Sequence, residues 1–183
     1  LKDPVQDKRA RVVGRAYFIW DGNIHMSKFY GSSTGGPIGK YIYLEHICFD
    51  AGREKSTLME YAQIHKLEHM NHILKTLRGA IDYMHETCRY CHWDIKPNNI
   101  VVHRANVGDL PVAKLIDFGT VRTINDEVAD IPGEFTGVGG FEWCSPDIEA
   151  MDEKTPLIAR EYQDRWSVSV CVACVVLTAV GLS

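Results

Sequence analysis

The fold is decided by the stretch Cys91-His92-Trp93-Asp94-Ile95-Lys96-Pro97-Asn98-Asn99-Ile100. This stretch places a carboxylate, a cation and an amide at fixed offsets in a short loop that contains a proline. Asp94 can accept a proton from a hydroxyl group, Lys96 can bind a phosphate oxygen, and Asn99 can ligate a hard metal ion. Together these three groups suit the transfer of a phosphoryl group.

The same stretch resembles the catalytic loop of eukaryotic protein kinases, which has the pattern H-R-D-x-K-x-x-N. Lysine two residues after the aspartate is the serine/threonine-type form of that loop. Trp93 stands where the family has the arginine that receives an activation-loop phosphate. A chance match in a polar turn is the alternative, and it is disfavoured because further motifs follow in the family's order.

The next motif is Leu115-Ile116-Asp117-Phe118-Gly119, which resembles the family's D-F-G. The apolar residues from Val112 to Ile116 predict a strand that delivers the carboxylate of Asp117 to a metal ion. Between the two motifs, residues 103–111 contain Gly, Asp and Pro and predict the turn of a hairpin.

Two later segments continue the family's order. Residues 139–147 resemble the end of a kinase activation segment, and residues 164–170 resemble the start of the central helix of the large lobe. The apolar run from Trp166 to Leu182 predicts a buried core helix. A transmembrane helix is less favoured, because the run is short for one and hydroxyl residues interrupt it.

Upstream of the catalytic loop, apolar residues at helical spacing predict one long amphipathic helix over residues 62–87. This helix would present the catalytic loop at its C-terminal end. His65, His69 and His72 lie on it at a spacing that could bind a metal ion, but an exposed helix face is the favoured interpretation.

The segment before that helix is β-prone. Residues 41–48 resemble the last small-lobe strand and the hinge of a kinase, and residues 24–30 predict the preceding strand. The glycine-rich residues 31–37 lack the spacing of a phosphate-binding loop and predict the hairpin turn between the two strands.

The resemblance implies an α+β, protein kinase-like fold with a mainly helical large lobe and a remnant of the small-lobe β-sheet, incomplete at both ends. Residues 1–47 would form the small-lobe remnant and hinge, and residues 48–183 the partial large lobe. Nothing before residue 24 resembles the family's glycine-rich loop or its strand lysine, and no glutamate occurs before Glu45. These departures favour a piece of a longer coding sequence over a naturally truncated protein.

The resemblance also implies ATP and Mg²⁺ as cofactors and assigns catalytic roles. Asp94 would orient the substrate hydroxyl and accept its proton, and Lys96 would stabilise charge on the transferred phosphoryl group. Asn99 and Asp117 would ligate Mg²⁺.

The adenine of ATP would be held at the hinge. By position, Leu44 corresponds to the gatekeeper, and the backbone groups of Glu45 and Ile47 would contact the adenine edge. Val101 is the candidate floor beneath the ring.

Composition agrees with a soluble globular protein. Of the 183 residues, 45% are apolar and 24% are charged, and the net charge of −4 implies no general affinity for nucleic acid. Cys88/Cys91 and Cys171/Cys174 have the C-x-x-C spacing of zinc ligands. Unpaired cysteines in a cytoplasmic or nuclear protein are the favoured interpretation.

Two functions are therefore open. The first is an active serine/threonine kinase with a protein substrate, favoured by Asp94, Lys96, Asn99 and Asp117 together. The second is a pseudokinase or truncated kinase-like protein that binds partners without catalysis, favoured by the missing lysine strand and by Gly140 in place of a threonine. No membrane partner is expected.

Overall fold

The computed structural model describes residues 29–33, 41–44, 56–128, 141–149 and 157–182. The α-helices are α2 (Leu58–His65), α3 (Met70–Asp82), α4 (Pro146–Glu149) and α5 (Glu161–Ala179), joined by the π-helical turn η1 (Tyr83–Thr87) and the 3-10 turns η2 (Pro97–Asn99) and η4 (Phe141–Trp143). The strands are β1 (Phe29–Ser33), β2 (Tyr41–Leu44), β3 (Ser56–Thr57), β4 (Tyr90–Cys91), β5 (Ile100–His103), β6 (Val112–Leu115), β7 (Arg122–Thr123), β8 (Glu127–Val128) and β9 (Leu157–Ile158).

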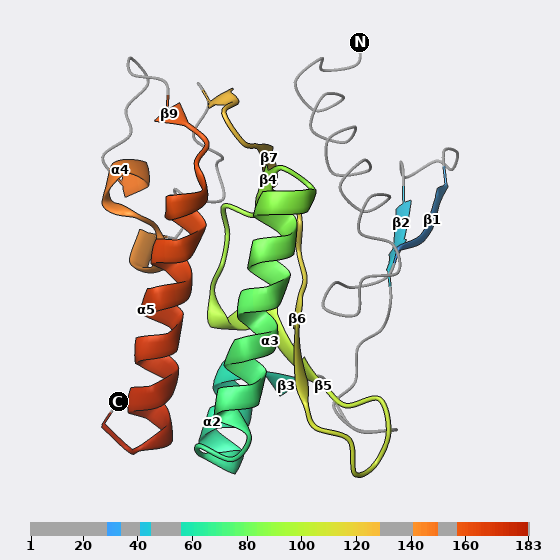
Figure 1. Ribbon diagram of the computed structural model, residues 1–183, viewed down its shortest axis with the longest axis vertical. Helices are drawn as coiled ribbons and strands as arrows, with labels where there is room; N and C mark the ends of the chain where they lie inside the picture. The colour runs from blue at the N-terminus through green and yellow to red at the C-terminus, as the bar shows by residue number, and fades with distance from the viewer. Residues whose placement is uncertain (1–28, 34–40, 45–55, 129–140, 150–156, 183) are drawn as a thin grey trace.

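A three-stranded antiparallel sheet of order β3-β5-β6 lies behind and beside α2 and α3 (Figure 1). Strands β5 and β6 pair from Ile100 opposite Leu115 to His103 opposite Val112, which confirms the predicted hairpin. Helix α3 packs against β6 and α2 packs against α5. Helices α3 and α5 run side by side in opposite directions, so the end of α3 and the start of α5 lie near each other (Figure 1).

The prediction of one helix over residues 62–87 is wrong, because the chain forms two helices there. Helix α2 ends at His65 and α3 begins at Met70. Between them Lys66 and His69 have φ angles of 57° and 54°, which lie in the left-handed region and interrupt a right-handed helix.

Burial explains why the apolar pattern was misleading. Ile64 and Leu67, which fit the apolar spacing, are 71% and 50% exposed, whereas Ile73, Leu77 and Ile81 on α3 are buried in the core. The apolar spacing therefore predicted the buried face of α3 and η1 correctly, but not that of α2.

A different local signal begins α2. The side chain of Thr57 accepts a hydrogen bond from Glu60 N, and the Glu60 carboxylate accepts one from Thr57 N at 2.7 Å. This reciprocal capping starts the helix four residues earlier than the apolar pattern predicted.

Helix α5 is buried along one face, whereas its apolar composition predicted a helix buried all round. The buried residues begin with the adjacent pair Gln163 and Asp164 and then recur every three or four positions at Ser167, Cys171, Val175 and Ala179. On other faces Trp166 and Leu177 are 46% and 45% exposed. Within the described residues, no helix is both long and apolar enough to cross a membrane.

Strands β1 and β2 form a separate antiparallel pair, in which Ser33 lies opposite Tyr41. Residues 31–33, predicted to lie in the turn, extend β1 instead. Leu44 is the last residue of β2. Glu45 and Ile47, the predicted adenine contacts of the hinge, lie outside the described residues.

Candidate active site

Two of the three predicted catalytic residues, Lys96 and Asn99, donate hydrogen bonds to the carboxylate of the third, Asp94. The ammonium of Lys96 donates to both oxygens of Asp94, with Nζ–O distances of 3.0 and 2.8 Å. Asn99 Nδ2 donates to Asp94 Oδ2 and to the Asp94 carbonyl oxygen, each at 2.8 Å. The loop from β4 through η2 to β5 is short enough to bring these groups together. The Asp94 carboxylate is therefore held in place by a neighbouring cation and amide.

The fourth predicted residue, Asp117, lies next to this loop because of the β5–β6 pairing. The pairing continues past the strands, with Ile116 N donating to Asn99 O at 3.0 Å. Asp117 is exposed and has a φ of 61°, so the chain turns sharply after β6. A side chain on Gly119 would place its Cβ 3.3 Å from Asp117 Oδ1, so the Asp117 carboxylate would have to shift by a few tenths of an ångström.

The donor set of Asn99 and Asp117 fits a hard divalent cation. Because Nδ2 of Asn99 is used in holding Asp94, its carbonyl oxygen Oδ1 is the end of the amide left to face a ligand. A carboxylate and an amide oxygen on adjacent segments are the donor types that Mg²⁺ accepts. The chemistry of the two side chains therefore agrees with the predicted metal ligands.

The predicted adenine-binding residues have a different outcome. Val101 is fully buried in β5, opposite Lys114 of β6. Its contact with adenine stays a prediction, as do the roles of Leu44, Glu45 and Ile47.

Asp164, which the sequence identified only as part of a helix motif, binds the backbone of the catalytic loop through its carboxylate. It is 1% exposed in the first turn of α5. Its two oxygens accept hydrogen bonds from His92 N at 2.7 Å and from Trp93 N at 2.9 Å. His85 Nε2 lies 2.8 Å from the same carboxylate. The only signal in the sequence for this role was the place of Asp164 at the start of residues 164–170, which resemble the opening of the central helix.

His92 joins the catalytic loop to the Asp117 segment. Its Nε2 donates to Ile116 O at 3.1 Å, and its ring packs 5.1 Å from that of Phe118. Thr120 Oγ1 donates to the His92 carbonyl oxygen at 2.8 Å. Burial lowers the pKa of His92, which outweighs the nearby carboxylates Asp164 and Asp94, so the ring stays neutral.

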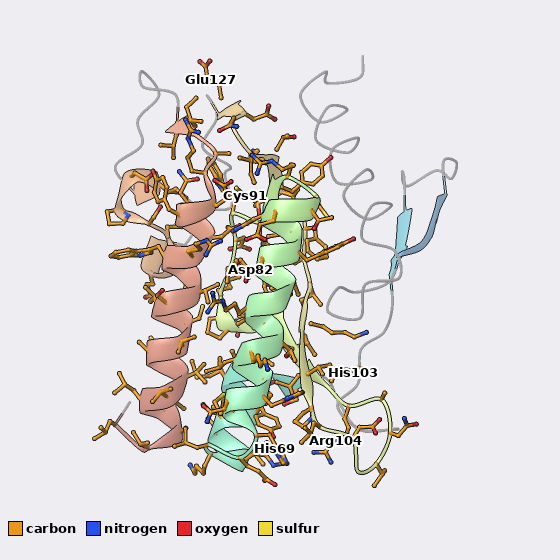
Figure 2. The ribbon with its side chains drawn as sticks, viewed as in Figure 1. His69, Asp82, Cys91, His103, Arg104 and Glu127 are labelled. Atoms are coloured by element: carbon orange, nitrogen blue, oxygen red, sulfur yellow. The ribbon has the colours of Figure 1, made fainter. Side chains whose placement is uncertain are left out.

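One buried group among the described residues has the composition of a metal site: His85, Cys91 and Asp164, with ligand atoms within 4.8 Å of one another. Figure 2 shows Cys91 beyond the C-terminal end of α3. Asp164 already binds two backbone amides and His85. Burial, followed by the charge of Asp164, raises the pKa of the Cys91 thiol, so in the metal-free protein this thiol is protonated. We therefore assign this group a structural role.

Two comparisons with known proteins found matches to the chain. A family model described as the protein kinase domain matches residues 35–182. The chain is similar to the solved structure of the Cydia pomonella granulovirus kinase PK-1, with 15% identity and a TM-score of 0.66. The match covers 92% of this chain and 55% of the viral kinase chain, so the chain spans about half the length of that structure. No curated protein matches the chain.

Proposed function

The chain belongs to the protein kinase family and has its fold, and on this basis we propose that it carries the catalytic loop of a protein serine/threonine kinase. The reaction would move the γ-phosphoryl group of ATP to a hydroxyl group of a protein substrate. The observation that carries the proposal is the convergence of Lys96 and Asn99 on the Asp94 carboxylate, with Asp117 on the adjacent segment.

Each of these side chains has a separate task in the proposed reaction. Asp94 orients the substrate hydroxyl and accepts its proton as the oxygen attacks phosphorus. Lys96, already beside Asp94, stabilises negative charge on the transferred group. Asn99 and Asp117 would hold Mg²⁺, which neutralises phosphate charge when bound.

The lysine at position 96 supports serine or threonine as the acceptor, because it is the form of the loop found in serine/threonine-type kinases. A protein that binds partners without catalysis is the second candidate. It is favoured by Gly140, which stands where the family has the threonine that braces the residues corresponding to Asp94 and Lys96.

The decisive variant is Asp94→Asn in the natural full-length protein. The change keeps the size of the side chain and removes the proton acceptor, so phosphoryl transfer from labelled ATP to a mixed protein substrate should fall at least 100-fold, on the order expected for a lost general base. Asp109→Asn, in the exposed β5–β6 loop, is the matched control and should retain full activity.

Transfer by Asp94→Asn at the control's rate would refute the proposed role of Asp94. A wild-type protein that transfers no phosphoryl group, although it is folded and binds a protein partner, would instead favour the second candidate.

A further inference from the structure

Trp93 occupies an unusual position in the catalytic loop. Its φ is 66°, a left-handed conformation that is rare for bulky residues, and it is 3% exposed. The guanidinium of Arg122 lies over its ring, 5.8 Å from the ring centre. Because Trp93 immediately precedes Asp94, whatever holds Trp93 in this conformation also sets the direction of the proposed proton acceptor.

Gln163 holds the indole of Trp93 from α5. Trp93 Nε1 donates to Gln163 Oε1 at 2.7 Å, and Arg160 N donates to the same oxygen at 2.9 Å. Gln163 is 1% exposed. Its amide is therefore a buried polar group whose hydrogen bonds are costly to break.

The nitrogen of the Gln163 amide contacts Asp147, which lies in α4. Gln163 Nε2 donates to Asp147 Oδ2 at 2.8 Å. Asp147 also accepts hydrogen bonds from Ser145 Oγ and from the Tyr162 hydroxyl. Burial raises the pKa of Asp147, but the hydrogen bonds from Ser145, Tyr162 and Gln163 outweigh it and hold this pKa below its ordinary value. Asp147 is thus a carboxylate that requires these donors.

We propose that Gln163 is a positioning residue that couples the segment at Asp147 to the catalytic loop through Trp93. We call the hydrogen-bonded chain Trp93–Gln163–Asp147 the amide bridge. It rests on the proposed function, because its effect on the reaction is to keep Asp94 aimed at the substrate. A neutral amide suits this position, since it donates to a carboxylate on one side and accepts from an indole on the other.

The amide bridge can be tested by reversing which residue, 163 or 147, donates the hydrogen bond between them. Gln163→Glu keeps an oxygen that accepts the hydrogen bond from Trp93, but it replaces the donor to Asp147 with a carboxylate oxygen. The interaction between positions 163 and 147 therefore becomes repulsive. Adding Asp147→Asn reverses the polarity of the pair, because the new amide can donate to the new carboxylate. The Ile158 carbonyl, which accepts from Gln163 Nε2 at 3.3 Å, and the Tyr162 hydroxyl, which donates to Asp147 Oδ2, do not regain their partners, so the rescue is partial. The double variant keeps one negative charge in the bridge, as in the natural protein.

In the full-length protein we expect Gln163→Glu to lower kcat about tenfold, the size of effect expected when one buried hydrogen bond is lost. The KM for ATP should change little, because no residue of the amide bridge is among those proposed to bind ATP. The double variant should recover kcat to within about threefold of the natural value. Gln63→Glu, at an exposed position of α2, is the matched control and should change neither constant.

Hydrogen exchange of the Trp93 and Asp94 amides gives a second readout that needs no activity. Exchange should accelerate in Gln163→Glu, return in the double variant, and accelerate also in Trp93→Phe, which keeps an aromatic ring but lacks the indole N–H. Trp93→Phe tests the proposal even where Gln163→Glu fails to fold.

The proposal is overturned if the folded double variant has the same kcat and the same amide exchange rates as Gln163→Glu. It is also overturned if Trp93→Phe leaves exchange at Asp94 unchanged. Absence of phosphoryl transfer by the natural protein would refute the proposed function, but the exchange measurement would still decide whether the amide bridge positions the loop.

Discussion

At the scale of single residues, the catalytic loop depends on partners that are distant in sequence. Asp164 binds the backbone of His92 and Trp93 across 72 and 71 residues. Thr120 binds the carbonyl of His92 across 28 residues. These contacts are buried, so each partner fixes loop geometry at a site where water cannot replace it.

Thr120 provides a direct test of this dependence. Thr120→Val keeps the shape of the side chain but leaves the buried His92 carbonyl without its donor, so we expect the free energy of unfolding to fall by about 1–3 kcal/mol. Urea unfolding measures the change. Thr123→Val, at a half-buried position of β7, is the control and should cost less. Equal losses in the two variants would contradict the role of the Thr120 hydrogen bond.

His92 should make stability depend on pH. Its pKa in the folded protein is lowered from 6.5, because burial disfavours the charged ring. Below about pH 6.5 the unfolded chain therefore binds a proton that the folded chain does not, and stability falls as the pH is lowered. The free energy of unfolding at pH 7.5 minus that at pH 5.5 should be smaller in His92→Gln than in the natural protein. An identical difference would show that His92 does not contribute.

At the scale of elements, the break between α2 and α3 depends on left-handed residues. His69 precedes α3 with a φ of 54°, which glycine adopts without the steric cost that other residues incur. His69→Gly should leave the free energy of unfolding unchanged or raise it by up to about 1 kcal/mol. Lys75→Gly, within α3, should lower it by about 1 kcal/mol. Similar losses in both variants would indicate a continuous helix.

The same elements show what the sequence could predict. Residues Asp94 to Asn99 lie within one short loop, so their spacing alone indicated that their side chains could meet. The β5–β6 hairpin was predictable for the same reason, since its turn residues and both apolar strands are contiguous. The helix break was not predictable from periodicity, because Ile64 and Leu67 continue the apolar spacing although both are exposed. The roles of Asp164 and Gln163 depend on the packing of α5 beside the loop, which no local pattern encodes.

At the scale of the whole molecule, α3 and α5 act as a paired support for the catalytic loop. His85 lies in η1, which directly follows α3, and its buried contact with Asp164 of α5 at 2.8 Å joins the two. Arg165 on α5 also lies 3.4 Å from Asp82, and Figure 2 shows Asp82 on the side of α3 that faces α5. The backbone of the loop is therefore hydrogen-bonded to Asp164 at the start of α5, which in turn contacts His85 of η1. At its other end the loop continues into the β5–β6 hairpin.

The central claim is that this support presents Asp94 to a serine or threonine hydroxyl. The most direct test is phosphoamino-acid analysis of a mixed protein substrate labelled from γ-labelled ATP by the natural full-length protein and by its Asp94→Asn variant. We predict label on serine and threonine with the natural protein and almost none with the variant. Label confined to tyrosine, or equal serine and threonine label with both proteins, would contradict the claim.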